Sequence, residues 1–358
     1  AGEYPGVAMK AGWQTKPFDE CIEKVTYTSK IQRKDFLVDG AYPIISQEDA
    51  FINGYWDHRA DLFKITTPVV VFGDHTKVLK YVDFDFVLGA DGVKILQPKS
   101  FLLPKFFYYQ LQTANLHSLG YARHYKLLKE LIITCPSLPE QQRIVGILDQ
   151  AFAGIATAKA NAEKNLQNAR ALFESHLNGI DAAKVPLGDL VNITTGKLDA
   201  NAAVENGQYP FFTCSREVYA INNFAFDCEA ILLAGNNAFG DFNVKHYKGK
   251  FNAYQRTYVI TVNEKQLAMY RFLYFQMLKS LKKFKQQSVG AGTKFLKLGI
   301  IKGMEISLPN IGEQEQIVST MDSLRKQTDS LESIYQQKLT ALDELKKALL
   351  HQAFSGQL

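Results

Sequence analysis

One segment of this chain returns in similar form after 167 positions. Tyr42-Pro43-Ile44-Ile45-Ser46 reappears as Tyr209-Pro210-Phe211-Phe212-Thr213, and a stretch with several short apolar runs follows both copies. Each copy then passes into a long segment with the apolar spacing of a helix. Solenoid repeats have periods of roughly 20–50 residues. A repeat as long as this one therefore indicates a duplicated domain together with its own helix.

The two helical segments open alike and carry the spacing of a coiled coil. The first begins Leu138-Pro139-Glu140-Gln141, and the second has Leu308-Pro309 followed by Glu313-Gln314. A proline in the first turn and an acidic residue close to it both suit a helix start. Apolar residues then recur at alternating steps of three and four, as in a coiled-coil seam. The predicted seam residues are Ile144, Leu148, Ile155 and Leu172 in the first helix, and Ile317, Met321, Leu324, Leu331, Leu342, Leu345 and Leu349 in the second.

Helices of this kind need a partner, and the nearest candidate for each is the other. Their expected length of about 34–38 residues corresponds to roughly 50–57 Å at 1.5 Å per residue. One apolar stripe on an isolated helix is not enough to keep it folded in water. Because each helix leaves a duplicated module at the same place, we expect an antiparallel pair with pseudo-twofold symmetry and one module at each end.

The predicted fold is therefore α+β, with two duplicated mixed α/β modules separated by two long antiparallel coiled-coil helices. We expect the first module at residues 10–137, the first helix at 138–180, the second module at 181–307 and the second helix at 308–358. The chain length agrees with about two domains of roughly 100–200 residues each. Apolar runs on both sides of a turn at residues 89–92 predict a hairpin inside the first module.

Several classes of protein are excluded. No apolar run approaches the roughly 18 residues of a membrane span, and no secretory signal pattern opens the chain. Residues 1–8, ahead of Met9, carry no pattern and are expected to be foreign to the natural chain. The four cysteines contain no Cys-x-x-Cys pair and predict buried free thiols, and the scattered histidines predict no metal site.

No catalytic motif is present either. The chain has no Walker A loop, no dinucleotide-binding glycine motif and no Asp/Asn-Pro-Pro-Tyr/Phe methyltransferase signature. The stretch Gly290-Ala291-Gly292 lacks the lysine of a phosphate loop, so it is either a simple turn or a flexible tip near DNA. We therefore predict that this chain is not an enzyme and binds no cofactor itself.

Positive charge is concentrated on the second module. Residues 184–306 hold 16 Lys and Arg against 9 Asp and Glu, whereas residues 16–136 hold 15 against 14. Basic modules favour a polyanionic ligand, and polar loop residues can reach its phosphates or base edges. A solvated surface is the alternative for each of them. The candidate DNA contacts are Arg33, Lys34, His58, Arg59, His75, Lys77, Arg123 and His124 in the first module, and Lys197, Arg216, Asn236, Asn237, Lys245, Gln255, Arg256, Thr293 and Lys294 in the second.

The expected geometry predicts a divided target on DNA. Modules about 50 Å apart would meet a duplex about one and a half turns apart, since one turn is roughly 34–36 Å. The two modules differ in their side chains, so their half-sites should differ in sequence. We therefore expect an asymmetric bipartite site with a gap of unread bases.

Four motifs carry a family resemblance. They are the paired Leu-Pro…Glu-Gln…Ile-Val helix openings, the Leu177-Asn178-Gly179-Ile180 close, the terminal Ala353-Phe354-Ser355-Gly356-Gln357-Leu358, and Val185-Pro186-Leu187-Gly188-Asp189-Leu190 at the start of the second module. In combination they resemble the specificity subunit of type I restriction–modification systems, over essentially Met9 to Leu358.

This resemblance implies a role for each part of the chain. The modules would be target recognition domains and the helices spacers. The partners would be double-stranded DNA, two methyltransferase subunits and two endonuclease subunits, in the cytoplasm. Adenine methylation with S-adenosylmethionine, and cleavage with ATP and Mg, would belong to those partner subunits. The main alternative is a coiled-coil adaptor that never meets DNA, against which the basic second module argues. A stand-alone nuclease is a weaker alternative.

Overall fold

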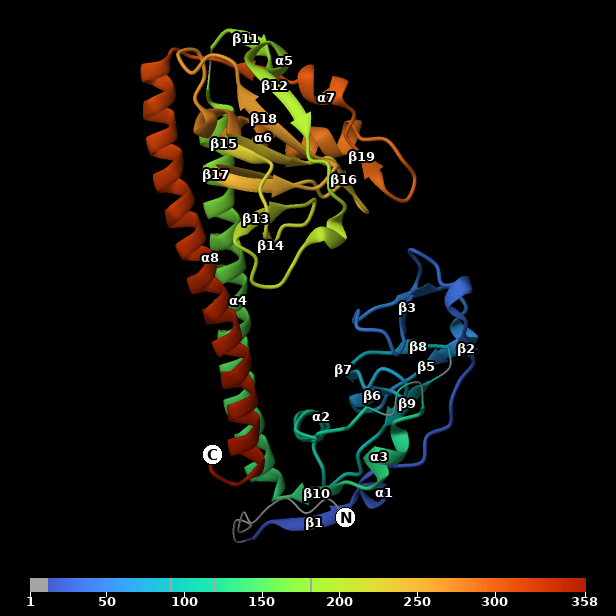
Figure 1. Ribbon diagram of the computed structural model, residues 1–358. Helices are drawn as coiled ribbons and strands as arrows, with labels where there is room; N and C mark the ends of the chain where they lie inside the picture. Colours follow the sequence, from blue (N-terminus) through green and yellow to red (C-terminus); the bar gives the residue numbers. More distant parts are fainter. Residues whose placement is uncertain (1–11, 91, 119, 121, 181) are drawn as a thin grey trace. The chain divides into compact units, whose positions relative to one another are not determined.

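The computed structural model describes residues 12–90, 92–118, 120, 122–180 and 182–358. Residues 1–8, and Asp91 in the predicted hairpin turn, lie outside the described residues. The chain divides into two compact units, one formed by residues 1–162 with 337–358 and the other by residues 163–336. Both long helices contribute residues to each unit (Figure 1).

The two long helices are longer than the sequence predicts. Helix α4 covers Leu138–Asn178 with 41 residues, and α8 covers Ile311–Phe354 with 44. Helix α8 begins at Ile311 and not at the predicted residue 308, because Asn310, the residue directly after Pro309, caps the helix. The Glu313 backbone N–H donates to Asn310 Oδ1 (3.0 Å), and the Asn310 N–H donates to Glu313 Oε2 (3.2 Å). This reciprocal pair is a capping box, which fixes the first turn.

In the first unit, the start of α4 packs on the end of α8. Ile144 shares a buried apolar cluster with Ala353. Further along, Lys159 forms an ion pair with Asp343. Residue numbers rise along one helix as they fall along the other, so the helices are antiparallel in this unit.

In the second unit, the end of α4 packs on the start of α8. Leu177 lies in one cluster with Met321, and Arg170 forms an ion pair with Glu332 at 2.7 Å. The helices are therefore antiparallel here as well, and the predicted antiparallel pairing is confirmed in each unit.

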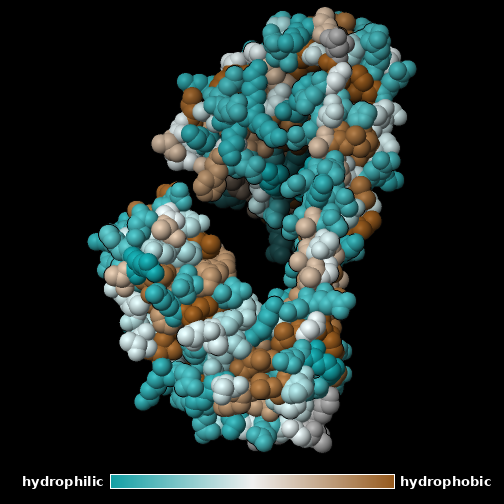
Figure 2. Space-filling model, turned by 180° about the vertical axis from the view of Figure 1, so that it is seen from behind, coloured by the Kyte–Doolittle hydropathy of each residue, from teal (hydrophilic) through white to brown (hydrophobic). Residues whose placement is uncertain are grey.

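The predicted seam matches the buried residues only in part. Ile144, Leu148, Ile155 and Met321 are buried, and Ile317, Leu324, Leu342 and Leu349 are half-buried. The remaining three seam residues, Leu172, Leu331 and Leu345, are exposed, so their placement in the seam was wrong. Hydrophobic patches interrupt the hydrophilic surface along the long helices in the space-filling view (Figure 2).

A shift of the buried seam by one residue explains why Leu172, Leu331 and Leu345 are exposed. Phe173, Glu332 and Lys346 face the partner helix in place of their neighbours. Phe173 packs on the cluster that contains Met321 of α8, Glu332 pairs with Arg170, and the Lys346 ammonium lies 5.1 Å from the Phe152 ring centroid. From Ile155, the less exposed positions of α4 include Ala158, Ala162, Leu166, Ala169 and Phe173, so two steps of four follow each other at Ala162. This interruption of the alternating steps of three and four moves the seam by one residue.

The second module is built on one six-stranded sheet in the order β12-β18-β15-β17-β13-β14 (Figure 1). Alternate residues of β15 face opposite sides: Ile231 and Leu233 join the core under α6, while Ala230 and Leu232 join a second core with Phe251. The main elements are β12 (Val191–Thr195), β13 (Tyr209–Phe212), β14 (Tyr219–Ile221), β15 (Phe226–Ala234), β17 (Val244–Ala253), β18 (Thr257–Val262) and α6 (Tyr270–Gln287).

The first module has a similar strand arrangement divided between two sheets. One has the order β2-β8-β3-β4 with β5 also on β8, and the other has the order β7-β6-β9. The strands are β2 (Lys30–Ile31), β3 (Tyr42–Ile45), β4 (Gly54–Trp56), β5 (Leu62–Phe63), β6 (Val69–Gly73), β7 (Leu79–Val82), β8 (Phe86–Gly89) and β9 (Val93–Leu96). Strands β8 and β9 belong to different sheets, so the hairpin predicted around residues 89–92 is wrong.

Two interruptions divide the first module's sheet. β5 and β6 together occupy the place of β15, and residues 64–68 separate them. Pro68 has no N–H to donate to a ladder. β7 and β8 occupy the place of β17, and Asp83-Phe84-Asp85 separates them, with Asp85 Oδ1 accepting from the Ile65 N–H (2.9 Å). The interrupting residues therefore satisfy each other instead of a neighbouring strand.

Shorter elements join the modules to the helices in matching pairs. Strand β1 pairs with β10 in the first module, and β11 pairs with β20 in the second. The elements are β1 (Gln14–Pro17), α1 (Phe18–Cys21), α2 (Pro104–Gln112), α3 (Tyr125–Lys129), β10 (Ile132–Cys135), β11 (Lys184–Pro186), α5 (Leu187–Leu190), α7 (Leu298–Lys302) and β20 (Glu305–Ser307).

A buried glutamine joins the first module to α4. The Gln141 side chain is fully buried. Its Nε2 donates to the carbonyls of Phe101 (2.9 Å) and Pro136 (2.8 Å), and its Oε1 accepts from the N–H of Leu103 (2.8 Å), the residue that caps α2. Three backbone groups that would otherwise lack partners are thereby satisfied.

The second module repeats this contact with Gln314. Its Nε2 donates to the carbonyls of Leu267 (2.8 Å) and Pro309 (2.9 Å), and its Oε1 accepts from the N–H of Met269 (2.9 Å), the residue that caps α6. Gln314 is also fully buried. We call Gln141 and Gln314 the glutamine clamps.

An ion pair follows each clamp eight residues later. Asp149 on α4 pairs with Lys105 on α2 (2.8 Å), and Asp322 on α8 pairs with Arg271 on α6 (2.5 Å). Eight residues are just over two helical turns, so clamp and carboxylate lie on one face. Each module is thus held at two equivalent points of its helix.

Candidate nucleic-acid interface

The second-module candidates gather where β15 ends and β18 begins. Gln255 and Arg256 are exposed in the turn between β17 and β18, closed by the Thr257 N–H donating to the Tyr254 carbonyl (2.8 Å). The Gly235 N–H, just beyond β15, donates to the Arg256 carbonyl (2.9 Å). The turn therefore lies beside the residues that leave β15.

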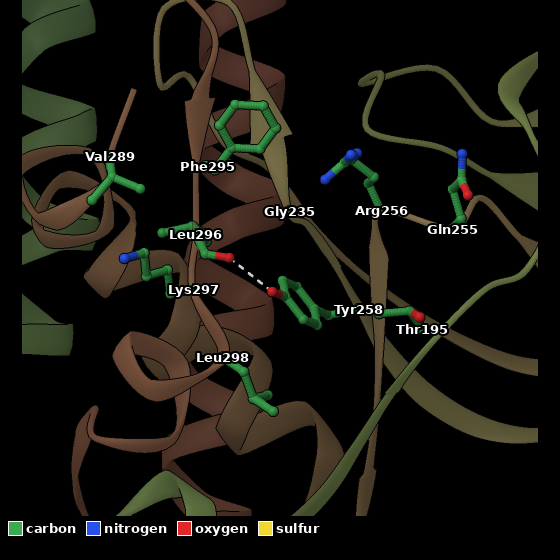
Figure 3. A pocket seen from close by; sticks show the side chains of 10 residues that line it. All are labelled: Thr195, Gly235, Gln255, Arg256, Tyr258, Val289, Phe295, Leu296, Lys297 and Leu298. Carbon is green, nitrogen blue, oxygen red and sulfur yellow. Dashed lines mark hydrogen bonds between the residues drawn. The ribbon is translucent and has the colours of Figure 1, made fainter. Parts of the chain in front are cut away.

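A pocket of about 480 Å³ opens at this edge. The Tyr258 hydroxyl on its wall donates to the Leu296 carbonyl (2.7 Å). The Arg256 guanidinium lies 5.3 Å from the centre of the Phe295 ring, an arrangement that stabilises a cation over an aromatic face. Gln255 and Arg256 extend to the side of the pocket on which Phe295 lies (Figure 3). The two side chains are therefore presented outward together.

A short two-stranded ribbon forms the next part of the edge. β16 (Asn236–Asn237) pairs antiparallel with β19 (Lys294–Phe295), with Asn237 opposite Lys294. Val289 and Phe295 bridge across the turn that contains Thr293, and Gly290 adopts a φ of +114°. The Gly290-Ala291-Gly292 stretch is thus the tip of a narrow hairpin beside four of the candidate residues.

The loop after β16 connects the ribbon to Arg216. Asn237 Oδ1 accepts from the N–H groups of Phe239 (2.9 Å) and Asp241 (3.1 Å). Arg216 forms an exposed ion pair with Asp241 at 2.7 Å. Contacts between exposed charges contribute little to stability, so Arg216 can exchange this partner for another anion.

Lys245 and Lys197 complete the set. The Lys245 ammonium is half-buried and donates to the Ser215 carbonyl (2.6 Å) and Asn243 Oδ1 (2.5 Å), and burial lowers its pKa. Lys245 therefore supports the loop of Arg216 from within. Lys197 is exposed beside Leu198, whose carbonyl accepts from the Gln255 N–H (2.8 Å). All nine second-module candidates thus lie along one connected edge.

Half of the first-module candidates gather at the turn between β6 and β7, which corresponds to the segment between β15 and β17 in the second module. His75 and Lys77 lie in this turn, where Lys77 adopts a left-handed φ of +62°. His124 is only 1% exposed, and its backbone N–H and Nδ1 both contact the Asp74 carbonyl (2.8 and 2.9 Å). His124 therefore braces this turn from inside, which corrects its place among the DNA-contacting candidates. Arg123 precedes it on the surface.

The other first-module candidates lie around a small apolar cluster. Arg33 and Lys34 are exposed on the 3-10 turn Arg33–Asp35, and Arg59 is exposed on the 3-10 turn Arg59–Asp61. The cluster contains Phe36 and Trp56, and the His58 ring lies 5.2 Å from that of Trp56. These four residues lie on or beside the two 3-10 turns, whereas His75 and Lys77 lie in the turn between β6 and β7, so the candidates of this module form two groups.

Two residues that the sequence reasoning passed over lie at the second-module edge. Lys297 is exposed on the pocket wall, and Phe239 is 81% exposed in the loop after β16. The sequence does contain a signal for Phe239, because it is an aromatic residue inside the turn sequence Asn237-Ala238-Phe239-Gly240-Asp241. Such a short loop has no apolar core in which the ring could be buried. Charge-based selection could not detect it.

Other kinds of site are not evident in the described part of the chain. No group of three His, Cys, Asp or Glu side chains there could hold a metal ion. No described helix is both long and apolar enough to cross a membrane. Cys21 and Cys135 are buried thiols that contact each other, Cys214 and Cys228 are partly buried, and all four are unbridged.

Comparison with known families gives matches in both halves of the chain. The family model described as "Type I restriction modification DNA specificity domain" matches residues 10–167 and again residues 180–341. The Type I restriction enzyme EcoDI specificity subunit of Escherichia coli is 42% identical over 179 residues, which are 50% of this chain and 39% of that protein. The EcoR124I/EcoR124II specificity subunit of the same organism is 30% identical over 151 residues, 38% of this chain and 37% of that protein. The matched segments therefore span well under half of each curated relative.

Solved structures match over nearly the full chain. One is described as "Structural basis underlying complex assembly and conformational transition of the type I R-M system", with a TM-score of 0.72, 15% identity, and coverage of 98% of this chain and 100% of that one. The HsdS subunit from Thermoanaerobacter tengcongensis gives a TM-score of 0.51 at 14% identity, covering 99% and 100%. At these identities the likeness shows the fold.

Proposed function

Because this chain belongs to the type I restriction–modification DNA specificity family, we propose that it is a non-catalytic subunit that reads an asymmetric bipartite DNA sequence. One observation carries the proposal: nine polar candidates of the second module, which has 16 basic against 9 acidic residues, lie along one connected edge. A basic edge of this kind suits a duplex, whose phosphates supply much of the affinity.

The residues along the edge divide by what they can recognise. Arg256 can donate two hydrogen bonds to a guanine, and the amide of Gln255 can pair with an adenine. Gln255 Nε2 donates to Asp199 Oδ1 (2.5 Å) in the free protein, so reading a base would exchange that bond. Lys197 and Lys297 are suited to phosphates. The β16–β19 ribbon has the form that fits a major groove.

We further propose that the two long helices set the gap between the half-sites. They are continuous over 41 and 44 residues, or roughly 60 Å each. The remaining exposed face of these helices would hold two methyltransferase and two endonuclease subunits, in the cytoplasm. S-adenosylmethionine, Mg and ATP would be bound by those subunits and not by this chain.

Selection from randomised duplexes tests the proposal. The full chain should enrich two short fixed blocks separated by a fixed gap, with binding that weakens steeply as salt rises. A single continuous block would contradict the bipartite reading. Salt-insensitive or absent retention on DNA would favour a protein adaptor instead.

Helix length tests the spacer role separately. Seven residues inserted into both helices at matching positions preserve the heptad seam and add roughly 10 Å. The preferred gap should then lengthen by about three base pairs at 3.4 Å each. An unchanged gap, with both blocks still enriched, would show that the helices do not set it.

A further inference from the structure

Phe239 is an apolar side chain in a place where none is needed for folding. It is 81% exposed, whereas Phe211, Phe251 and Phe272 of the same module are fully buried. A ring left in water forgoes roughly 1.5–3 kcal/mol of burial. Exposed aromatics of this kind are frequent where a protein meets a ligand.

The loop holds Phe239 in a defined position. Asn237 Oδ1 accepts from the Phe239 and Asp241 N–H groups. Gly240 closes the turn with a φ of +69°, which favours glycine. A Cβ at Gly240 would lie 3.1 Å from Lys285 Cγ and 3.4 Å from Lys294 Cγ, so the loop rests on the stems of two lysines.

The surroundings of Phe239 are cationic. Lys285 and Lys294 lie under its loop, and Arg216 pairs with Asp241 two residues away. An apolar ring among these side chains suits a ligand that offers negative charge and an apolar group side by side. Duplex DNA offers both in its major groove, where the thymine C5-methyl lies between phosphate backbones.

We propose that Phe239 recognises a thymine by packing against its C5-methyl group in the half-site read by the second module. This inference rests on the proposed DNA-reading function. Phe239 lies two residues after β16, so a β16–β19 ribbon in the major groove brings the ring to the base edges. The contact adds recognition of a methyl group to the hydrogen bonds that Gln255 and Arg256 can make to bases.

Removal of single methyl groups tests the proposal. Each thymine of the selected half-site is replaced in turn by deoxyuridine, which lacks only the C5-methyl. The wild-type chain should lose about three- to fivefold in affinity at one or two positions, the effect of one buried methyl. Phe239→Ala should bind the unmodified duplex at least about tenfold more weakly, and at those one or two positions it should bind the thymine and deoxyuridine forms equally. The effect of deoxyuridine at every other position should stay as in the wild type.

A second phenylalanine supplies the matched control. Phe224 is 42% exposed in the same module, but it precedes β15, packs on Tyr209 (5.1 Å between centroids) and lies under the Lys250 ammonium (4.6 Å). Phe224→Ala should leave the methyl dependence unchanged. Full methyl dependence in Phe239→Ala, or no methyl-dependent position in the wild-type site, overturns the thymine contact. Failure of the wild-type chain to select any duplex would instead reject the DNA-reading function itself.

Discussion

The two modules are most alike where they meet the long helices and least alike where strands end. Gln141 and Gln314 make the same three hydrogen bonds, and Asp149 and Asp322 follow each of them by eight residues. At the strand ends, the second module has the β16–β19 ribbon, while the described residues of the first have a short turn at the equivalent place.

This difference separates positioning from reading within one chain. The positioning contacts are between backbone groups and a buried amide, so they constrain few side chains of the module. The strand ends are free to change without disturbing them, and even the sheet differs, being continuous in one module and divided at Pro68 and at Asp83-Phe84-Asp85 in the other. Two modules that are attached to the helices in the same way can therefore read different half-sites.

Removing a glutamine clamp should produce the largest effect on stability. Gln141→Leu leaves two buried carbonyls and one N–H without partners, at about 1–3 kcal/mol for each group. We expect a loss of about 3–5 kcal/mol in the free energy of unfolding, measured by urea denaturation, and a similar loss for Gln314→Leu.

The neighbouring Gln142 is exposed and gives the control. Gln142→Leu should change stability by less than about 0.5 kcal/mol. If the losses in the free energy of unfolding differ by more than about twofold between Gln141→Leu and Gln314→Leu, the two attachments are not equivalent despite their geometry.

Lys80 of the first module should give the next largest effect, as a pH dependence. It is buried, and donates to the carbonyls of Ser46 and Ala50 and to Asn53 Oδ1 (2.8, 2.6 and 2.9 Å). Burial lowers its pKa to about 8 from an ordinary 10.5. Between these values the unfolded chain holds a proton that the folded chain has released, so stability rises with pH, by at most about 1.4 kcal/mol per unit.

The measurement is the slope of unfolding free energy against pH, compared with that of Lys80→Met. The variant should be less stable throughout, because the carbonyls lose their donor, but its rise between pH 8 and 10.5 should be smaller than that of the wild type. Lys245→Met tests the second module, where burial shifts the pKa in the same direction. A Lys80→Met slope equal to the wild-type slope would contradict the assignment.

The sequence predicts the repeated parts of this molecule better than the individual ones. Heptad spacing and the repeated Tyr-Pro segments indicate the helices, their pairing and the duplication, because these depend on periodic patterns. The hairpin at residues 89–92 failed because strand partners are chosen by distant residues, here Val87 with Ile44 and Ile95 with Val71. Leu172, Leu331 and Leu345 were misplaced because a one-residue seam shift leaves the heptad count almost unchanged.

The candidate interface shows the same limit. Its polar residues were found from charge and loop position, but their grouping along one edge in the second module depends on the fold. His124 resembled a surface residue by type and is buried under a turn, and Phe239 resembled a core residue by type and is exposed. Residue type alone does not distinguish these cases.

Arg256 should matter more for DNA binding than any single charge of the first module. Arg256→Ala should weaken binding to the selected duplex by about tenfold or more and relax the choice of one base. Arg59→Ala should cost less, since an exposed cation on a nearly neutral module contributes mainly one phosphate contact, and it should reduce the salt slope by about one. Lys265→Ala, beyond the other end of β18 and exposed, is the control and should change neither. Equal losses for Arg256→Ala and Lys265→Ala would place the interface elsewhere.

The ion pairs beside the clamps should give the smallest effect and the finest comparison between modules. Among the described residues, Asp322 pairs with Arg271, and both side chains are partly exposed, so Asp322→Asn should cost about 0.5 kcal/mol. Asp149 pairs with Lys105 and also accepts from the Tyr109 hydroxyl, whose pKa is raised by burial and by this carboxylate. Asp149→Asn should therefore cost more, about 1 kcal/mol, in urea denaturation of the full chain. Asp329→Asn, which breaks an exposed pair with Arg325 within α8, should cost no more than Asp322→Asn. A larger loss for Asp322→Asn than for Asp149→Asn would mean that the tyrosine contact adds nothing to the attachment of the first module.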